Sequence, residues 1–223
     1  MGAKPMAAKS TEEQKKDAVL DAALPDVAFD GWTLQGLIRA GEEAGLEQGE
    51  VRLLFPDGVR DAIAHFFARG DKAMLERLAK DDLASMKIRE RITHAVRVRL
   101  EVDAEHREAV RRAAAALSLS PTHFTGAQAL YRTVDAIWLA AGDTATDFNF
   151  YTKRALLSGV FVSTLFVWFG DTSEDFAETY AFLDRRIADV MQIEKGKAKL
   201  AKALSKFPDP VSFLGRLRYP GPR

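Results

Sequence analysis

Residues 155–169, ALLSGVFVSTLFVWF, form an uncharged apolar run that constrains the fold more than any other part of the sequence. A helix that spans a membrane needs about 20 apolar residues. This run is shorter, and charged residues flank it closely, with Lys153 and Arg154 before it and Asp171 after it. We therefore expect a buried central helix rather than a membrane span. Other helices, a second subunit or a ligand must cover it on all sides.

Helical periodicity extends over nearly the whole chain, and no segment alternates apolar and polar residues as a strand does. Capping residues, glycines and prolines divide the chain into about ten predicted helices. The sequence thus predicts an all-α protein. The expected ranges are 11–27, 33–45, 47–54, 59–82, 86–102, 104–118, 122–141, 147–169, 174–192 and 195–206.

Residues 32–58, WTLQGLIRAGEEAGLEQGEVRLLFPDG, have the layout of a helix, a glycine-containing turn and a short second helix. This layout resembles the helix-turn-helix of TetR-type regulators. A helix that reads DNA needs cations for the phosphates, but this one offers Glu47, Glu50 and a single Arg52. We therefore expect a retained scaffold that binds no nucleic acid. A ligand-responsive TetR-type transcriptional regulator is the alternative.

Composition indicates a folded protein with a basic tail. Hydrophobic residues make up 47% and charged residues 29% of the chain, which excludes a wholly disordered chain and a multi-span membrane protein. The sequence contains no Cys, which rules out disulfides and suits a reducing compartment. The net charge is zero, yet residues 195–223 hold eight basic residues and one acidic residue, so the remainder is acidic.

The first residues, MGAKPMAAKSTEEQKKDAV, lack the apolar stretch of a secretory signal. Their acidic residues and the absence of Arg argue against a mitochondrial transit peptide. We therefore expect a cytoplasmic protein that lies peripherally on the inner, cytoplasmic membrane face of a bacterium.

The sequence contains no pattern typical of a catalytic or metal site. No histidine pair has the spacing of a zinc site, and no Glu stands three positions before a His as in di-iron bundles. Asp143 and Asp147 are four positions apart, but Thr146 as a helix cap explains them better than paired catalytic acids. We expect no catalytic residue, no metal and no cofactor. The four scattered histidines are His65, His94, His106 and His123.

The segment IEKGKAKLAKALSKF combines lysines with an apolar stripe when it is drawn as a helix. Basic amphipathic helices of this kind lie on anionic membrane surfaces. A solvated tail that docks on its own domain is equally compatible with the sequence. The candidate membrane-binding residues are Lys197, Leu200, Lys202, Leu204 and Phe207.

The stretch AGDTATDFNFYTKRALLSG carries a more specific signal. Together with VDAIWL before it and DTSEDFAETYAFLDRRIADVM after it, it closely resembles the coenzyme Q biosynthesis protein nine family. The resemblance extends back to DGWTLQGLIRAGEEAGL and covers roughly residues 17–192. It implies a TetR-like, usually homodimeric all-α fold that no longer acts as a repressor.

The resemblance also implies a function. Proteins of this family bind isoprenoid lipid in an apolar pocket, contact the membrane through a C-terminal amphipathic helix, and support the di-iron hydroxylase of the demethoxyubiquinone ring. The lipid-binding candidates lie on the two helices of the quoted region, although an ordinary core with a dimer interface would explain the same residues. They are Trp138, Phe148, Leu156, Val160, Phe161, Ser163 and Phe166.

Motif positions that the family uses for its hydroxylase fall on Ile137, Trp138, Phe150 and Tyr151. Phe150 stands where eukaryotic members commonly have Trp, so the ring is kept while the indole N–H donor is lost. Neighbouring helix positions diverge by about 100°. We therefore expect Phe148 to point inward, and Phe150 and Tyr151 to reach an interface.

These observations predict a TetR-like bundle in three parts. Residues 1–58 form a degenerate helix-turn-helix-like module, residues 59–192 a bundle for lipid binding and dimerisation, and residues 193–223 a basic amphipathic tail. The predicted function is that of a non-catalytic accessory protein in ubiquinone biosynthesis. It binds a polyprenylated quinone intermediate and presents it to the demethoxyubiquinone hydroxylase at the membrane.

Overall fold

The computed structural model describes residues 11–118, 124–143 and 148–204, and for 124–125, 148–149 and 193–204 it describes the backbone alone. Within these ranges the chain forms nine α-helices, three short 3-10 helices and no strand. The α-helices are α1 (Thr11–Asp30), α2 (Leu34–Glu43), α3 (Gln48–Leu54), α4 (Val59–Leu78), α5 (Ile88–Val102), α6 (Arg107–Ser118), α7 (Phe124–Ala140), α8 (Phe148–Gly170) and α9 (Ala177–Leu204). The 3-10 helices are η1 (Leu83–Ser85), η2 (Ala104–His106) and η3 (Glu174–Phe176).

The all-α prediction is confirmed, and the helix boundaries differ from the expected ones mainly at the end of the chain. Helix α9 is continuous from Ala177 to Leu204, where the sequence predicts two helices separated near residue 193. A glycine inside a helix costs only about 1 kcal/mol relative to alanine. The Ala, Leu and Lys residues around Gly196 are strong helix formers, so the helix continues through it.

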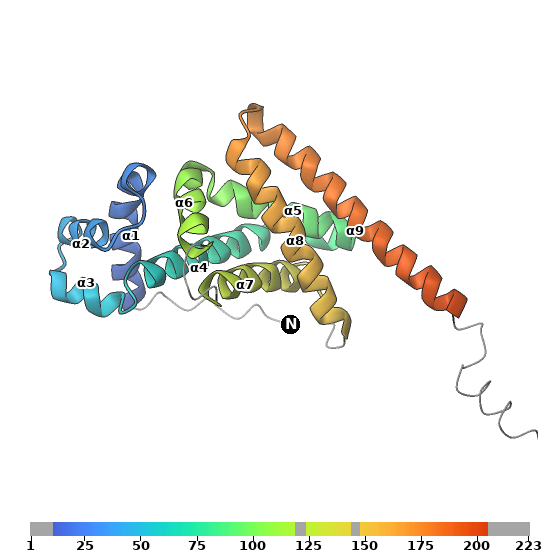
Figure 1. The fold of residues 1–223 in the computed structure, drawn as a ribbon, viewed down its shortest axis with the longest axis horizontal. Coiled ribbons are helices and arrows are strands. Elements are labelled where there is room, and N and C mark those ends of the chain that lie inside the picture. Colours follow the sequence, from blue (N-terminus) through green and yellow to red (C-terminus); the bar gives the residue numbers. More distant parts are fainter. Residues whose placement is uncertain (1–10, 119–123, 144–147, 205–223) are drawn as a thin grey trace, which may run out of the picture.

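Helices α1, α2 and α3 form a compact module at one end of the molecule (Figure 1). The side chain of Thr33 caps α2 as predicted, because it accepts a hydrogen bond of 3.0 Å from Gly36 N. A Cβ atom on Gly41 would lie 2.2 Å from Cγ2 of Val51, so α2 and α3 approach closely enough to require glycine. The tight helix-turn-helix geometry therefore follows from the sequence of α2.

Polar contacts attach this module to the rest of the protein. The indole Nε1 of Trp32 donates to Ala109 O in α6 at 3.0 Å. His65 Nε2 in α4 lies 2.9 Å from Asp17 Oδ1 in α1. Buried apolar residues of the module also share one core with those of the larger bundle. The core is therefore continuous across residue 58, and the domain boundary expected there stays a prediction.

Helix α4 runs from the module into the centre of the molecule, where α5 and α7 pack against it (Figure 1). Helix α8 packs on α7, and α9 packs on α8 and α5. Val96, Val134, Ile137, Trp168 and Leu183 are fully buried where these helices meet. The core of the larger bundle therefore lies between α4, α5, α7, α8 and α9.

Helix α8 is central but only partly covered. By length and composition alone, Phe150–Gly170 could span a membrane, a test that core helices of soluble proteins also pass. In this chain a third of that segment is buried. Ala155 and Gly159 are exposed, and Phe166 is 71% exposed. The expectation of a helix covered on all sides is therefore not met within the single chain.

The turn from α8 to α9 is fixed by the buried carboxylate of Asp171. It accepts hydrogen bonds from the backbone N–H and hydroxyl groups of Ser173 and Thr179, at 2.5–2.8 Å. Burial acts to raise the pKa of Asp171, but these four donors outweigh it and hold the pKa well below its usual value. Asp171 thus remains ionised and sets where α9 begins.

Candidate functional site

A largely apolar cavity of about 280 Å³ lies among helices α4 to α8. Its volume is close to the lower end of the range for small-molecule pockets, about 300–1,000 Å³. The apolar residues that line it include Phe67, Leu100, Val110, Leu117, Leu130, Phe161, Val162, Leu165, Phe166, Trp168 and Phe169.

The lining residues differ strongly in exposure, which gives the cavity an outer and an inner end. Phe166 is 71% exposed and Ser118 is exposed, so they lie at the outer end. Leu100 and Trp168 are fully buried, so they lie at the inner end. A ligand that enters from solvent therefore passes Phe166 before it reaches Trp168.

Charged side chains also line the inner end. Arg99 and Asp103 on the α5 side and Thr133 on α7 border the cavity, and all three are buried. We refer to these residues, together with Asp71 of α4, as the Arg99 cluster. Buried charges are costly unless they are paired, so the partners of Arg99 decide what this end of the cavity can do.

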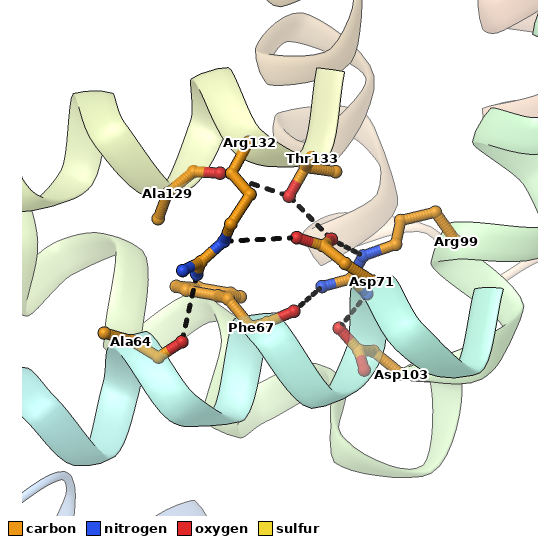
Figure 2. Close-up of polar contacts among 8 residues, drawn as sticks. All are labelled: Ala64, Phe67, Asp71, Arg99, Asp103, Ala129, Arg132 and Thr133. Atoms are coloured by element: carbon orange, nitrogen blue, oxygen red, sulfur yellow. Dashed lines mark hydrogen bonds and ion pairs between the residues drawn. The ribbon is translucent and has the colours of Figure 1, made fainter. Parts of the chain in front are cut away.

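Figure 2 shows that the members of the Arg99 cluster contact one another across three helices, although Asp71 Oδ2 has no hydrogen-bond partner among the described residues. Arg99 Nε donates to Asp71 Oδ1 at 2.9 Å, and Arg99 Nη1 donates to Asp103 Oδ2. The Thr133 hydroxyl donates to the same Asp71 oxygen at 2.7 Å. Arg132 lies at the edge of the cluster, with Nε 3.7 Å from Asp71 Oδ2, and it is about half exposed. The cluster therefore joins α4, α5 and α7.

Burial and pairing act in opposite directions on the charges of the cluster. Burial raises the pKa of Asp71 above its usual value, and Arg99 and Thr133 oppose this only in part. Burial alone would lower the pKa of Arg99, but Asp103 and Asp71 outweigh burial and raise it. Arg99 therefore stays cationic, and its positive charge compensates the carboxylates that it pairs with.

Gly70 allows the Arg99 side chain to lie against α4. A Cβ atom at this position would come within 2.7–2.8 Å of three guanidinium atoms of Arg99. Because the guanidinium is held by Asp71 and Asp103, it cannot swing away freely. The Arg99 cluster thus depends on glycine at position 70, directly before Asp71 in α4.

A second buried arginine organises the junction of α7 and α8. Arg154 is 3% exposed, and its Nε donates to Asp135 Oδ1 at 2.6 Å. Its Nη1 lies 3.3 Å from Asp143 Oδ2, and Lys153 Nζ lies 2.7 Å from Asp143 Oδ1. We refer to these four residues as the Arg154 cluster. Asp143 therefore pairs with two cations, which accounts for it without a catalytic role.

The predicted partner-binding aromatics surround the Arg154 cluster. The guanidinium carbon of Arg154 lies 3.4 Å from the centre of the Phe150 ring, and Lys153 Nζ lies 5.3 Å from the centre of the Trp138 ring. Phe150 and Tyr151 meet edge to face at 5.1 Å, and Tyr151 is 68% exposed. Ile137 is completely buried, so the structure places it in the core and not on this surface.

The structure divides the predicted lipid-binding residues. Phe161 and Phe166 line the cavity. Val160 is buried in the core, while Trp138, Leu156 and Ser163 are half-buried and lie outside the cavity lining. The side chain of Phe148 lies outside the described part of the chain. The cavity therefore faces some of the predicted positions of α8 and not others, and their role in lipid binding stays a prediction.

The predicted membrane-binding residues are not placed by their side chains. Lys197, Leu200, Lys202 and Leu204 belong to α9, whose backbone alone is described there. Phe207 lies outside the described residues. Their role therefore stays a prediction.

The sequence reasoning misses the Arg99 cluster, although a signal for it exists. Asp71 stands four positions after Phe67 and three before Met74, on the apolar face of α4. A charged residue on an apolar helix face indicates a buried partner. The partner itself, Arg99, is far away in sequence and could not be chosen from the pattern.

Together, these features define a TetR-like all-α protein with an apolar cavity in its larger bundle. The solved structure of a TetR transcriptional regulator from Nitrosomonas europaea superimposes with a TM-score of 0.64. The match covers 78% of this chain and 97% of the other, at 24% identity. At this identity the likeness shows the fold alone, and the predicted fold class is confirmed.

Sequence comparison shows similarity to one protein family. The COQ9 family model matches residues 124–194, which include α7, α8 and most of α9. The chain is 32% identical over 190 residues to the ubiquinone biosynthesis protein COQ9, mitochondrial, of Rattus norvegicus. It is 30% identical to the human protein of that name and 31% identical to the one from Drosophila melanogaster. The predicted resemblance to the COQ9 family is therefore confirmed.

These matches cover most of this chain but a smaller share of the relatives. They include 82% of this chain and 61% of the rat protein, 82% and 59% for the human protein, and 87% and 63% for the fly protein. The chain thus spans about three fifths of the length of the curated relatives it matches.

One prediction is wrong. The sequence predicts a location on the cytoplasmic membrane face of a bacterium, but the relatives are named as mitochondrial proteins. The prediction relied on the first residues and on the absence of Cys. Neither is a physical constraint on location, because targeting segments are addresses that receptors read and do not shape the fold.

Proposed function

We propose that the chain is a non-catalytic lipid-binding accessory protein in ubiquinone biosynthesis. It binds a polyprenylated quinone intermediate and presents it to the di-iron demethoxyubiquinone hydroxylase at a membrane. The observation that carries this proposal is the apolar cavity, since pockets for apolar ligands are lined in this way. The names of the COQ9 relatives supply the pathway.

The size of the cavity limits how much of such a lipid it holds. About 280 Å³ admits a substituted ring and the first part of a tail, so the remaining tail lies outside. The exposed ring of Phe166 at the outer end offers this tail an apolar contact. The protein therefore lowers the cost of taking part of a nearly insoluble molecule out of a bilayer.

The aromatic surface beside the Arg154 cluster is the proposed contact for the hydroxylase. Trp138, Phe150 and Tyr151 contribute to it, and Ile137 supports it from the core. Aromatic side chains are enriched where protein interfaces derive most of their binding energy. Homodimer formation and membrane contact through residues 193–223 complete the proposal.

Lipid extraction followed by mass spectrometry of the purified protein tests the central claim. We expect an isoprenoid or quinone lipid in the extract, or its uptake after incubation with quinone-loaded vesicles. The test variant is Phe161→Ser, which places a hydroxyl in the cavity lining and should reduce the recovered lipid. Empty protein under both conditions contradicts lipid binding.

A pull-down with the hydroxylase tests the aromatic surface. Tyr151→Ala should abolish capture while helicity by circular dichroism is unchanged, because the side chain is 68% exposed. Tyr131→Ala is a suitable control, because Tyr131 is an exposed aromatic outside the proposed surface and should leave capture intact. Equal capture by the Tyr151 variant and the unaltered protein rejects the assignment.

The alternative is a ligand-responsive TetR-type regulator, which the shared fold favours. Its recognition helix would be α3, where Glu47 is exposed and Glu50 pairs with Lys15. Carboxylates at this position repel phosphates. Specific binding to a palindromic DNA site at low salt would favour the regulator over the lipid-binding protein.

A further inference from the structure

The buried end of the cavity is polar, although most of the lining is apolar. Arg99, Asp103 and Thr133 meet the cavity there, and each is at most 5% exposed. An apolar tail alone does not require such groups, and burying them costs free energy. Their position suggests that the inner end receives the polar part of a ligand.

Hydrogen-bonding capacity remains at this end. A guanidinium has five N–H donors. Within the described residues Arg99 donates to Asp71, Asp103 and Phe67 O, the last over 3.5 Å, so two N–H groups remain. Of the Asp103 carboxylate, only Oδ2 takes part in a described bond. The cluster can therefore offer a donor and an acceptor to the same ligand.

The charges of the cluster disfavour an anion. Arg99 is shared between two carboxylates, and the half-exposed Arg132 adds a second positive charge 3.7 Å from Asp71. Arg107 lies near Trp168 but donates to the backbone oxygens of Trp168 and Asp171. A carboxylate or phosphate head at this end would face Asp103 directly. A neutral ring can accept from Arg99 through a carbonyl oxygen, or donate to Asp103 through a hydroxyl group, without that repulsion.

We propose that the cavity binds lipids head first and selects a neutral, hydrogen-bonding ring over an anionic head group through Arg99 and Asp103. This inference rests on the proposed function, because it assumes that the cavity holds a lipid. Thr133 positions Asp71, which in turn orients Arg99. In this bound state the tail leaves past Phe166 and the ring is shielded from water, so presentation to the hydroxylase requires the ring to move out of the cavity.

Competition with a neutral dye tests the selection. Nile red bound to the full chain at neutral pH is displaced by a decyl-substituted benzoquinone, by decanoate or by decylbenzene, all below their aggregation limits. The three share a chain and differ in the head. We expect the quinone to bind about tenfold more tightly than decanoate, with decylbenzene between them.

Two variants should shift the ratio of quinone affinity to decanoate affinity in opposite directions. Asp103→Asn removes a negative charge but keeps an acceptor for Arg99, so decanoate should gain affinity and the ratio should narrow. Arg132→Gln removes the outer positive charge, so the ratio should widen. Asp184→Asn is the matched control, since Asp184 pairs with Arg97 at 2.8 Å on the surface and should leave the ratio unchanged.

The outcomes separate the two proposals. Partly unfolded protein also binds apolar molecules, so the gain in decanoate binding by Asp103→Asn counts only when its helicity by circular dichroism matches the wild type. Arg132→Gln provides a second reading where the first variant is unstable. Equal binding of the three ligands, with no shift in either variant, overturns head-group selection and leaves lipid binding intact. Failure of every ligand to displace the dye overturns lipid binding itself.

Discussion

Arg99 and Arg154 are both 3% exposed, and each bridges two aspartates, yet their surroundings differ. The side chains of the partners of Arg99, Asp71 and Asp103, are 7% and 8% exposed. Of the two partners of Arg154, the Asp143 side chain is also enclosed, at 5% exposed, but that of Asp135 is 31% exposed. The Arg99 cluster is thus enclosed by helices, whereas the Arg154 cluster is open to water on one side.

This difference teaches how one chain uses the same ion-pair arrangement in two ways. Enclosed charges must be balanced by each other, so the Arg99 cluster holds three helices in register beside the cavity. Charges near water are balanced partly by solvent, so the Arg154 cluster can hold aromatic rings at the surface. The enclosed cluster therefore suits a ligand, and the open one suits a protein partner.

The largest expected effect comes from removing each arginine. Arg99→Met should lower the free energy of unfolding by about 3–5 kcal/mol, because two buried carboxylates lose their cation. Arg154→Met should cost less, about 1–3 kcal/mol, because Asp135 can be hydrated and Lys153 still pairs with Asp143. Urea denaturation at neutral pH measures both. Equal losses would show that the two clusters are enclosed to the same degree.

A smaller effect is expected when a methyl group is added beside the enclosed cluster. Gly70→Ala should destabilise the protein by about 1–3 kcal/mol, because the new Cβ displaces the Arg99 guanidinium. Gly159→Ala is the control on the exposed side of α8, where nothing lies within 4 Å of the new atom. It should stabilise the helix by up to about 1 kcal/mol. Thermal unfolding of both variants measures the contrast, and a neutral Gly70→Ala would contradict the close fit.

The smallest effect is a dependence of stability on pH, which differs between Asp71 of the enclosed cluster and Asp171. The lowered pKa of Asp171 stabilises the fold above its unfolded pKa of about 3.9, and this contribution is lost as the pH falls. The raised pKa of Asp71 acts in the opposite sense, so its contribution is present at low pH and is lost as the pH rises through the folded pKa.

The measurement is the free energy of unfolding of the wild type relative to Asp171→Asn and to Asp71→Asn, from about pH 3 to pH 7. As the pH rises, the free energy of unfolding of the wild type should increase relative to that of Asp171→Asn and decrease relative to that of Asp71→Asn. Parallel curves for the two comparisons would mean that burial does not dominate at Asp71.

The sequence predicts the fold of this protein well and its site only in part. Helices, caps and the helix-turn-helix layout follow from local patterns, as the Thr33 cap illustrates. The cavity depends on which helix faces meet, and these faces are set by contacts between distant segments. Phe161 and Phe166 were identified because α8 is apolar all round, but Leu156 and Ser163 lie on other sides of it.

The continuity of α9 has a geometric consequence. Its 28 residues span about 42 Å at 1.5 Å per residue, and Ile187 near its middle is buried against the core. Val190 also packs against the core, so the part beyond it extends about 21 Å as a helical rod. Each inserted residue would turn the end of this rod by about 100° relative to the cavity. The continuous helix thus fixes both the distance and the direction from the cavity to the end of α9.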